Sequence, residues 1–286
     1  QVFRNQGPLQ LNGDDGDDIF VVRAFVTAAS VTSYDSNIDT HIAGGDGSNY
    51  IEYSMNAPVH IDGGSGHDLL VVVGTELDDT FVITATGVFG SGLQVDFTNV
   101  EELAIYGLEG DDNFYVLSTS ASLSIQIYGG LGSDHVQVGG SAPTIKVLNA
   151  TARLLEDMSF APTTLADIHG TLVVSGATDP NPRYDVDLSV YLPTVLPGEN
   201  SGNPLPITAS SGGAIETAQV DTLVVDNHLD GAGLDATLDG TTVSPTGSAK
   251  AWTVDYTAFE DLQVLLGTAA DRVEVVTTHS GTTSVD

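Results

Sequence analysis

A short glycine-rich turn that leads into a β-strand recurs along this chain and limits the folds it can adopt. Each copy begins with Gly, usually has a second Gly three positions later, and carries Asp or Asn five positions after the first Gly. The copies read GDDGDDIF (13–20), GGDGSNYI (44–51), GGSGHDLL (63–70), GTELDDTF (74–81), GLEGDDNF (107–114) and GGLGSDHV (129–136). Six copies of one turn followed by a strand indicate a repetitive β architecture.

The segments that follow the turns are short and rich in β-branched and aromatic residues, which is typical of β-strands. Long stretches with helical periodicity are missing, and 32 glycines among 286 residues supply many turns. Strands are predicted at IFVV (19–22), LLVVV (69–73), TFVIT (80–84), FYVL (114–117) and TLVV (171–174 and 222–225). The sequence therefore predicts an all-β chain.

The spacing of the turns predicts how the strands are stacked. Gly63 and Gly107 are 44 residues apart, and Gly107 and Gly129 are 22 apart. A coil of about 22 residues has room for two or three short strands with their turns. It would place Gly63, Gly107 and Gly129 along one edge, with Gly74 half a coil away. The predicted fold is thus a parallel β-helix, or β-solenoid, with glycine and aspartate turns.

A longer repeat is superimposed on the short one. VDFTNVEELAI (95–105) returns as VDYTAFEDLQV (254–264), an offset of 159 residues. The predicted organisation is a β-solenoid over 1–148, a Pro- and Gly-rich insertion or less regular coils over 149–219, and a second, truncated copy of the solenoid unit over 220–286. Because the chain opens and closes in mid-pattern, we expect it to be a piece of a longer modular protein.

The insertion contains an alternating segment, Tyr184 to Leu192, that predicts a strand with one buried face. Two interpretations of this region stay open. It is a surface loop or hairpin tolerated by the solenoid, or it is a contact arm that adds a strand to a neighbouring molecule.

The net charge of the chain limits the classes of partner that it can bind. Against 39 Asp and Glu there are 7 Lys and Arg, which gives a formal net charge of −32. Such a chain is a poor partner for nucleic acid or an anionic membrane surface. No stretch is apolar and long enough to predict a membrane-spanning helix, and Cys is absent. Cations are the expected partners.

Acidic residues crowd into the turns, as in GLEGDDNF. Two carboxylates about 4 Å apart repel by about 1 kcal/mol in water and about 4 kcal/mol near a protein surface. A hard cation between the carboxylates turns this repulsion into a net attraction, and calcium accepts oxygen ligands in flexible geometry. The alternative is that these residues are solvated, since Asp and Gly are common in β-turns. The fixed position of Asp after Gly favours the cation.

The pattern Gly-Gly-x-Gly-x-Asp-x-apolar at 63–70 and 129–136 resembles the RTX, or haemolysin-type, calcium-binding repeat. This resemblance implies a secreted bacterial β-roll or parallel β-helix in which each turn gives backbone carbonyls and an Asp carboxylate to calcium. The side-chain ligands that it implies are Asp18, Asp68, Asp79, Asp112 and Asp134, with Asn49 as a weaker, neutral ligand and with Asp235 and Asp271 as looser matches. The family usually runs in uninterrupted tandem, whereas these motifs are spaced apart, so isolated calcium sites are expected.

No catalytic residue is predicted. The histidines show no metalloprotease spacing, and the few cations are scattered along the sequence. We therefore expect a non-catalytic structural or adhesive segment of a large secreted surface, filament or extracellular-matrix protein. Its expected partners are calcium ions and copies of itself or neighbouring repeats, with surface polysaccharide as a further candidate.

Two alternatives remain. The first is a calcium-dependent β-helix module of a polysaccharide-processing lyase, epimerase or glycosidase, which would need a groove that combines carboxylates with Arg or Lys. The second is a passive calcium-binding module attached to a catalytic domain elsewhere in a longer chain.

Overall fold

The computed structural model describes residues 9–22, 40–53, 58–91, 93–148, 155–184, 219–246 and 251–286. Within these ranges the regular elements are β-strands, apart from the short 3-10 turn η2 (Leu165–Asp167). The prediction of an all-β chain is confirmed. None of the described residues belongs to a helix with the length and apolar character needed to cross a bilayer.

Most strands belong to two large sheets. Sheet I has 11 strands in the order β1-β3-β5-β9-β8-β7-β11-β13-β17-β21-β23, and sheet II has 10 in the order β2-β4-β6-β10-β12-β16-β20-β19-β18-β22. The strands of sheet I are β1 (Leu9–Asn12), β3 (Thr40–Ala43), β5 (Pro58–Asp62), β7 (Thr80–Thr84), β8 (Gly87–Gly90), β9 (Leu93–Thr98), β11 (Asn113–Val116), β13 (His135–Gly139), β17 (Thr222–Asp226), β21 (Asp261–Leu265) and β23 (Thr282–Val285). Those of sheet II are β2 (Ile19–Val22), β4 (Tyr50–Tyr53), β6 (Leu69–Val73), β10 (Glu102–Glu109), β12 (Ser124–Leu131), β16 (Gly170–Ala177), β18 (Asp235–Leu238), β19 (Thr242–Pro245), β20 (Trp252–Thr257) and β22 (Arg272–Val275).

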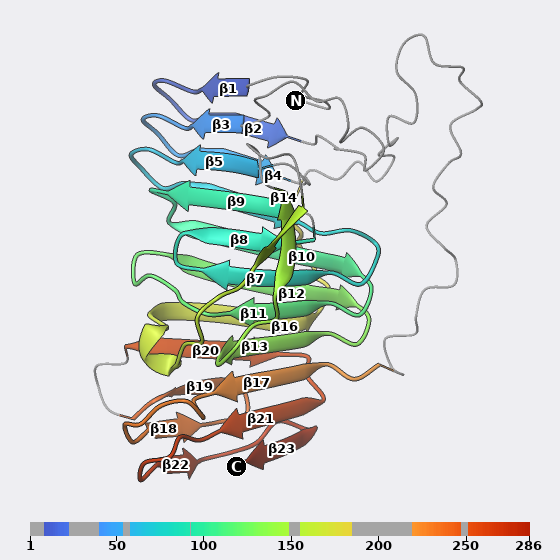
Figure 1. Cartoon of the computed structure of the whole chain (residues 1–286), viewed down its shortest axis with the longest axis vertical. Helices are drawn as coiled ribbons and strands as arrows, with labels where there is room; N and C mark the ends of the chain where they lie inside the picture. Colours follow the sequence, from blue (N-terminus) through green and yellow to red (C-terminus); the bar gives the residue numbers. More distant parts are fainter. Residues whose placement is uncertain are drawn as a thin grey trace, which may run out of the picture.

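The chain passes back and forth between these sheets, so that β1, β3 and β5 lie in sheet I while β2, β4 and β6 lie in sheet II. Neighbouring strands are mostly parallel, as β10 is with both β6 and β12. Figure 1 shows the strands stacked along the long axis of the molecule, with β1 at one end of the stack and β22 and β23 at the other. We call one strand of each sheet, taken together, a level. Long parallel sheets connected in this way are compatible with the predicted β-solenoid.

The predicted strands and their inward side chains are confirmed. β2, β6 and β7 have the predicted bounds, β11 begins one residue earlier, and β16 and β17 contain the two TLVV segments. The apolar residues that follow the turns pack between the sheets in one core cluster. Those that are fully buried are Ile51, Leu70, Phe81, Phe114 and Val136. Burial of each such side chain stabilises the fold by about 1.5–3 kcal/mol.

The two segments that contain the long repeat make similar antiparallel excursions. The first copy makes an antiparallel excursion, β7-β8-β9, within sheet I. The second copy makes the same excursion, β18-β19-β20, within sheet II. The related strands β9 and β20 therefore lie in different sheets. We call one passage of the chain through both sheets a circuit. The second copy is offset from the first by half a circuit.

The predicted stacking of Gly63 with Gly107 is wrong. The Gly74 N–H donates to the carbonyl of Tyr106 at 2.8 Å, which places Gly74 beside Gly107. Gly63 lies on the opposite edge, where its N–H donates to the Thr98 carbonyl at 3.0 Å. The physical reason is the antiparallel excursion, because β8 adds residues to the chain without adding a level.

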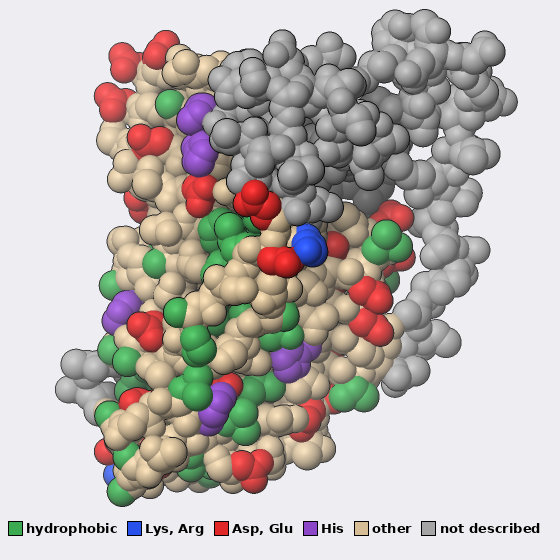
Figure 2. Space-filling model, viewed as in Figure 1, with side chains coloured by type: hydrophobic (Ala, Val, Ile, Leu, Met, Phe, Trp, Pro, Cys, Tyr) green, Lys and Arg blue, Asp and Glu red, His purple; other side chains and the backbone are tan. Residues whose placement is uncertain are grey.

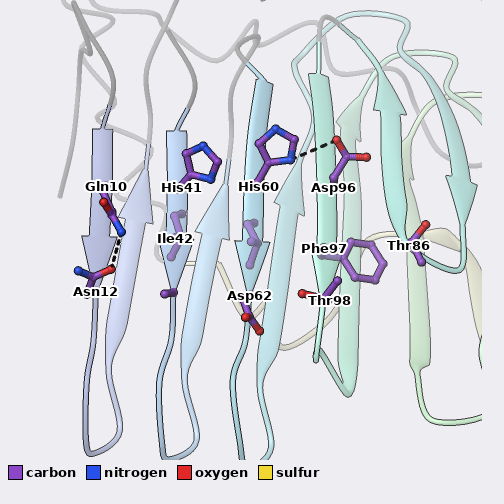
Figure 3. Close-up of a pocket in the computed structure, with 12 residues that line it drawn as sticks. Gln10, Asn12, His41, Ile42, His60, Asp62, Thr86, Asp96, Phe97 and Thr98 are labelled. Atoms are coloured by element: carbon purple, nitrogen blue, oxygen red, sulfur yellow. Dashed lines mark hydrogen bonds and ion pairs between the residues drawn. The ribbon is translucent and has the colours of Figure 1, made fainter. Parts of the chain in front are cut away.

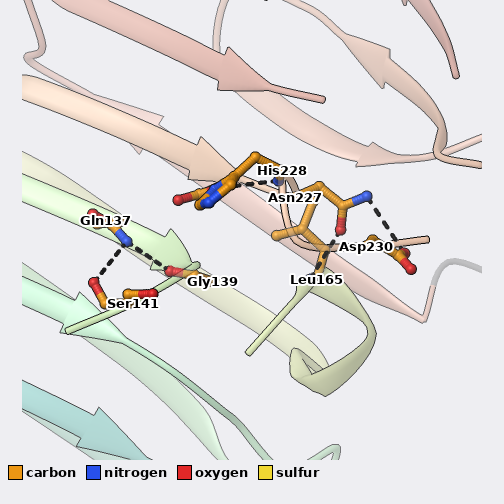
Figure 4. Close-up of polar contacts among 8 residues, drawn as sticks. Gln137, Gly139, Ser141, Leu165, Asn227, His228 and Asp230 are labelled. Atoms are coloured by element: carbon orange, nitrogen blue, oxygen red, sulfur yellow. Dashed lines mark hydrogen bonds and ion pairs between the residues drawn. The ribbon is translucent and has the colours of Figure 1, made fainter. Parts of the chain in front are cut away.

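A second excursion, residues 140–169, leaves the sheets after β13 and carries the antiparallel pair β14 (Ile145–Leu148) and β15 (Leu155–Met158) as well as η2. Asn227, at the end of β17, holds it in place. Its Oδ1 accepts from the Leu165 N–H at 3.2 Å, and its Nδ2 lies 3.5 Å from Asp230 Oδ2 (Figure 4).

Among its described residues, the region predicted as an insertion, 149–219, contains a regular member of the stack. β16 pairs with β12 and β20 in sheet II. After β16 the chain crosses the outer face of this sheet, where the Tyr184 ring meets Tyr106 edge-on at 4.6 Å and Arg183 pairs with Glu102. Beyond Tyr184, the predicted strand to Leu192 lies outside the described residues.

Candidate functional site

The predicted ligand Asp112 folds back into its own turn rather than toward solvent. It is fully buried, and a Cβ placed on Gly107 would lie only 2.1 Å from Asp112 Oδ2. Glycine is therefore required at the first position of this turn because the carboxylate of the sixth residue occupies the space of a side chain. This explains the fixed Gly-to-Asp spacing in physical terms.

From the second residue of each column onward, the inward side chain accepts a hydrogen bond from the backbone of the level before it. In the first column, Asn49 accepts from the Asp18 N–H at 3.0 Å, and Asp68 accepts from the Asn49 N–H at 2.8 Å. Glu101 ends the column by accepting from the Asp68 N–H at 2.9 Å. The predicted residues Asp18, Asn49 and Asp68 are thus brought together along one edge.

A second column runs along the opposite edge. Asp112 accepts from the Asp79 N–H at 2.7 Å, and Asp134 accepts from the Asp112 N–H at 2.9 Å. The column continues through Asp221, which accepts from Asp134 at 2.7 Å, and ends at Glu260, which accepts from Asp221 at 2.8 Å. Hydrogen bonds between levels therefore hold these carboxylates in register with one another.

Adjacent acidic residues in one turn diverge. Asp112 points inward, whereas Asp111 is exposed and accepts from the Ser133 N–H of the following level at 2.8 Å. Asp78, in the level before, accepts from the Asp111 N–H at 3.0 Å in the same manner. The crowded acidic motif is thus a pair of hydrogen-bonded columns, one buried and one at the surface.

The hydrogen bonds satisfy only one oxygen of the buried carboxylates. The Oδ2 atoms of Asp18, Asp68 and Asp112 are buried and have no hydrogen-bond partner in the structure. A buried carboxylate oxygen with no donor costs about 1–3 kcal/mol or more. A hydrogen-bond donor or a cation beside these atoms would remove this cost.

Asn49 shows which group this second position accommodates. Its Nδ2 donates to Asp68 Oδ1 at 2.9 Å and to the Gly63 carbonyl at 3.2 Å. A Cβ placed on Gly44 would lie 2.6 Å from that Nδ2 and 2.1 Å from the Gly63 carbonyl oxygen. In this level an amide donor therefore faces a carbonyl acceptor.

In the levels that carry Asp at the position of Asn49, two hydrogen-bond acceptors lie at this place. A Cβ placed on Gly107 would lie 2.1 Å from Asp112 Oδ2 and 2.3 Å from the Gly129 carbonyl oxygen. Around Gly63 the corresponding distances are 2.9 Å to Asp68 Oδ2 and 1.9 Å to the Asn99 carbonyl oxygen. Carboxylate and carbonyl oxygens thus converge where Asn49 places an N–H group.

Burial raises the pKa of Asp112 to about 8. The hydrogen bond from the Asp79 N–H lowers this pKa, and the negative charges of Asp134, Asp79 and Asp78 raise it. The buried site thus disfavours a bare carboxylate at Asp112, and a positive ion or a proton would relieve that penalty.

The two looser ligand matches are placed differently. Asp271 accepts from the Leu234 N–H at 2.6 Å, so it has the same role as the other column residues. Asp235 lies one position after Leu234, at the start of β18, and is exposed beside Arg272 at 3.7 Å. The structure therefore does not bring Asp235 into a column.

Asp221, Glu101 and Glu260 are column residues that the sequence motif did not reveal. A Cβ on Gly176 would lie 2.4 Å from Asp221 Oδ2, so these two residues form a normal turn pair. Residues 177–220 separate them in the sequence, so this pair does not show the five-residue spacing of the other turns. Glu101 and Glu260 occupy the same place in the long repeat, and that repetition was the available signal.

Removal of the Glu101 side chain tests the end of the first column. Glu101→Ala leaves the Asp68 N–H without its acceptor and is expected to lower the free energy of unfolding by about 1–2 kcal/mol. Glu101→Gln keeps an acceptor oxygen and should recover most of this loss. Urea unfolding measures both, and Glu76→Ala, in an exposed part of a turn, is the control. Equal stability of Glu101→Ala and Glu76→Ala would contradict the hydrogen-bond role.

The oxygen atoms at the columns suit a hard cation such as Ca²⁺, which binds carboxylate and backbone carbonyl groups. Within the described ranges, no three His, Cys, Asp or Glu side chains surround one point. Any ion here would therefore depend on backbone carbonyls for much of its coordination. No family model, no curated protein and no solved structure matches this chain.

Proposed function

We propose that this chain is a calcium-stabilised parallel β-helix that serves as a non-catalytic structural or adhesive segment of a secreted surface, filament or matrix protein. The observation that carries the proposal is the set of buried Asp oxygens that face carbonyl oxygens at the turns. Stacked levels of this kind gain a stabilising contact only when a positive ion or a proton lies between the two acceptors.

Asp68 and Asp112 are the residues that would hold calcium most directly. Their Oδ2 atoms lack a donor, and the carbonyls of Asn99 and Gly129 lie beside them. When bound, calcium would supply positive charge to these oxygens and offset the burial that opposes ionisation of Asp112. The chain's own part is to orient the oxygens through the hydrogen bonds between levels and to exclude water from them.

The surface charge supports a cation partner. Asp15 and Asp46 lie in parallel register at neighbouring levels, and Ser65 Oγ donates to Asp46 Oδ1 at 2.6 Å. On the face shown in Figure 2, acidic side chains are spread along the length of the stack and few cationic ones are seen. With a formal charge of −32, the folded chain gains stability from divalent counterions.

Calcium would also couple folding to location. At low calcium the buried carboxylates oppose close stacking of the turns, which leaves the chain less stable and suited to export. At the millimolar calcium typical of extracellular modules, binding would favour the folded state. This mechanism places the working form outside the cell, where we propose that it acts with copies of itself, with neighbouring repeats or with surface polysaccharide.

The grooves in the described residues do not favour the enzyme alternative. The groove across β1, β3, β5 and β9 contains Asp62 and Asp96, and none of the described residues that line it is Arg or Lys. The smaller groove beside β14 is lined by Lys146 without a carboxylate. Neither combines the cationic and acidic groups that uronate chemistry needs.

Thermal unfolding with calcium or with EGTA tests the calcium proposal. We expect calcium to raise the melting temperature in a concentration-dependent manner, with stabilisation of about 2.7 kcal/mol at a calcium concentration 100-fold above the Kd. Magnesium should stabilise the chain less, because it demands stricter geometry. The double substitution Asp68→Asn and Asp112→Asn should reduce the calcium effect, and Glu76→Gln with Asp111→Asn, at exposed positions, is the control for the same change in charge.

A melting temperature that calcium does not change would reject the cation role and leave protonated carboxylates as the explanation for the buried oxygens. Electron microscopy with and without calcium tests the structural role separately. Filaments or ordered layers are expected, whereas dispersed monomers at all calcium concentrations would contradict self-association.

A further inference from the structure

A pair of histidines lies on the outer face of sheet I, away from the aspartate columns. The parallel register of β1, β3, β5 and β9 places Gln10, His41, His60 and Asp96 in one row across the strands. The rings of His41 and His60 are stacked, with their centroids 5.0 Å apart and their planes at 27°. Figure 3 shows both rings on the same side of the sheet and Asp96 on the next strand.

Asp96 is positioned to orient one of these rings. Its Oδ2 lies 3.5 Å from His60 Nδ1, and both side chains are partly exposed. Histidines that bind metals commonly present the second ring nitrogen to a carboxylate, which fixes the tautomer and makes the imidazole a better ligand. The contact with Asp96 therefore leaves His60 Nε2 as the ligand atom.

The spacing of the rings suits a single ion. Tetrahedral zinc with Zn–N distances of about 2.0–2.1 Å needs its two nitrogens about 3.3 Å apart. The two stacked rings have their centroids 5.0 Å apart, so both side chains must rotate to bring one nitrogen of each ring to that separation. Imidazole pairs favour Zn²⁺, Cu²⁺ and Ni²⁺ over Ca²⁺.

The surroundings favour a cation and have room for its remaining ligands. The groove has a volume of about 610 Å³, which accommodates the ion and its waters. Asp62, in the neighbouring row, adds a second negative charge to the groove and accepts from Asn99 Nδ2 at 2.7 Å. Among the residues that the structure describes, no Lys or Arg lines the groove to oppose a positive ion.

We propose that His41 and His60 form a binding site for a borderline divalent transition metal ion such as Zn²⁺, with Asp96 as the carboxylate behind His60. The site has two protein ligands, and water completes the coordination. It is independent of calcium at the turns, because its ligands are nitrogens on a different face of the molecule. The register across strands creates it, so the spacing of the histidines along the sequence does not reveal it.

Isothermal titration of the full chain with ZnCl₂, in the presence of saturating CaCl₂, tests this site. We expect one high-affinity Zn²⁺ per chain, lost in His41→Ala and in His60→Ala. Asp96→Asn should weaken binding by about 10-fold, because it removes the orienting carboxylate. His67→Ala is the matched control, since His67 is exposed on a turn at the edge of the stack, and it should bind as the unchanged chain does.

Imidazole proton signals in NMR spectra provide a readout that does not depend on heat. Only the signals of His41 and His60 should shift when Zn²⁺ is added, and excess Ca²⁺ should not reverse the shift. Zn²⁺ uptake that persists in both His41→Ala and His60→Ala, or that Ca²⁺ displaces, would overturn the proposal. Thermal melts of the variants confirm that they are folded, which is expected because both histidines are exposed.

Discussion

Gly107→Ala is expected to lower the free energy of unfolding by about 3 kcal/mol, at the upper end of the cost of overpacking. The added methyl group would lie 2.1 Å from Asp112 Oδ2 and 2.3 Å from the Gly129 carbonyl oxygen. Neither atom can withdraw freely, because Asp112 Oδ1 accepts from the Asp79 N–H at 2.7 Å and the carbonyl belongs to a paired strand. The column would have to open at this level.

Urea unfolding measures this effect, and Gly231→Ala is its matched control. A Cβ on Gly231 meets nothing within 4 Å, so this change should alter stability by less than about 1 kcal/mol. Similar losses for both substitutions would show that glycine at position 107 serves only the backbone conformation, and that the carboxylate does not need the space.

The stability of the chain in EGTA should fall as the pH rises from about 4 to about 8. The pKa of Asp112 is raised by burial to about 8 in the folded state, whereas an unfolded Asp has a pKa of about 3.9. Between these values the folded state binds more protons, so the free energy of unfolding decreases with pH by at most about 1.4 kcal/mol per pH unit. The stabilisation is complete below the unfolded pKa and is lost above the folded one.

Asp112→Asn should flatten this profile and make the chain more stable in EGTA at pH about 8. The new amide can donate to the Gly129 carbonyl, as the Asn49 Nδ2 donates to Gly63 at 3.2 Å. Urea unfolding at a series of pH values tests this, with Asp111→Asn as the control because it changes the same charge at an exposed position. If Asp112→Asn destabilises the chain at high pH, the unfavourable contact between Asp112 Oδ2 and the Gly129 carbonyl oxygen is contradicted.

Local patterns in the sequence were sufficient for the strands and for most of the columns. β-branched runs such as 69–73 and 80–84 coincide with β6 and β7, because these residues suit a buried strand and the flanking glycine turns end it. The Gly-to-Asp spacing located Asp18, Asp68, Asp79, Asp112 and Asp134, because the two residues of each pair share one turn.

Long-range features could not be obtained in the same way. Asp221 lost its local partner when a long segment entered between it and Gly176, although the two still meet in space. Gly63 was assigned to the wrong edge because residue counts do not distinguish a level from the antiparallel β8. The pairing of His41 with His60 depends on the register of two strands, which their sequence spacing does not specify. The same limit applies to the second oxygen of Asp112, since the sequence cannot show that a carbonyl faces it.

The placement of β9 and β20 in different sheets bears on how such a chain lengthens. Both sheets accept the same repeat unit. Recombination between copies of the repeat can therefore change the length of the chain by half a circuit and still give a continuous stack of strands. Asp221 of the later copy extends the column that Asp79 begins in the earlier one. A gene for such a protein can therefore gain or lose half-circuits and still encode an unbroken stack.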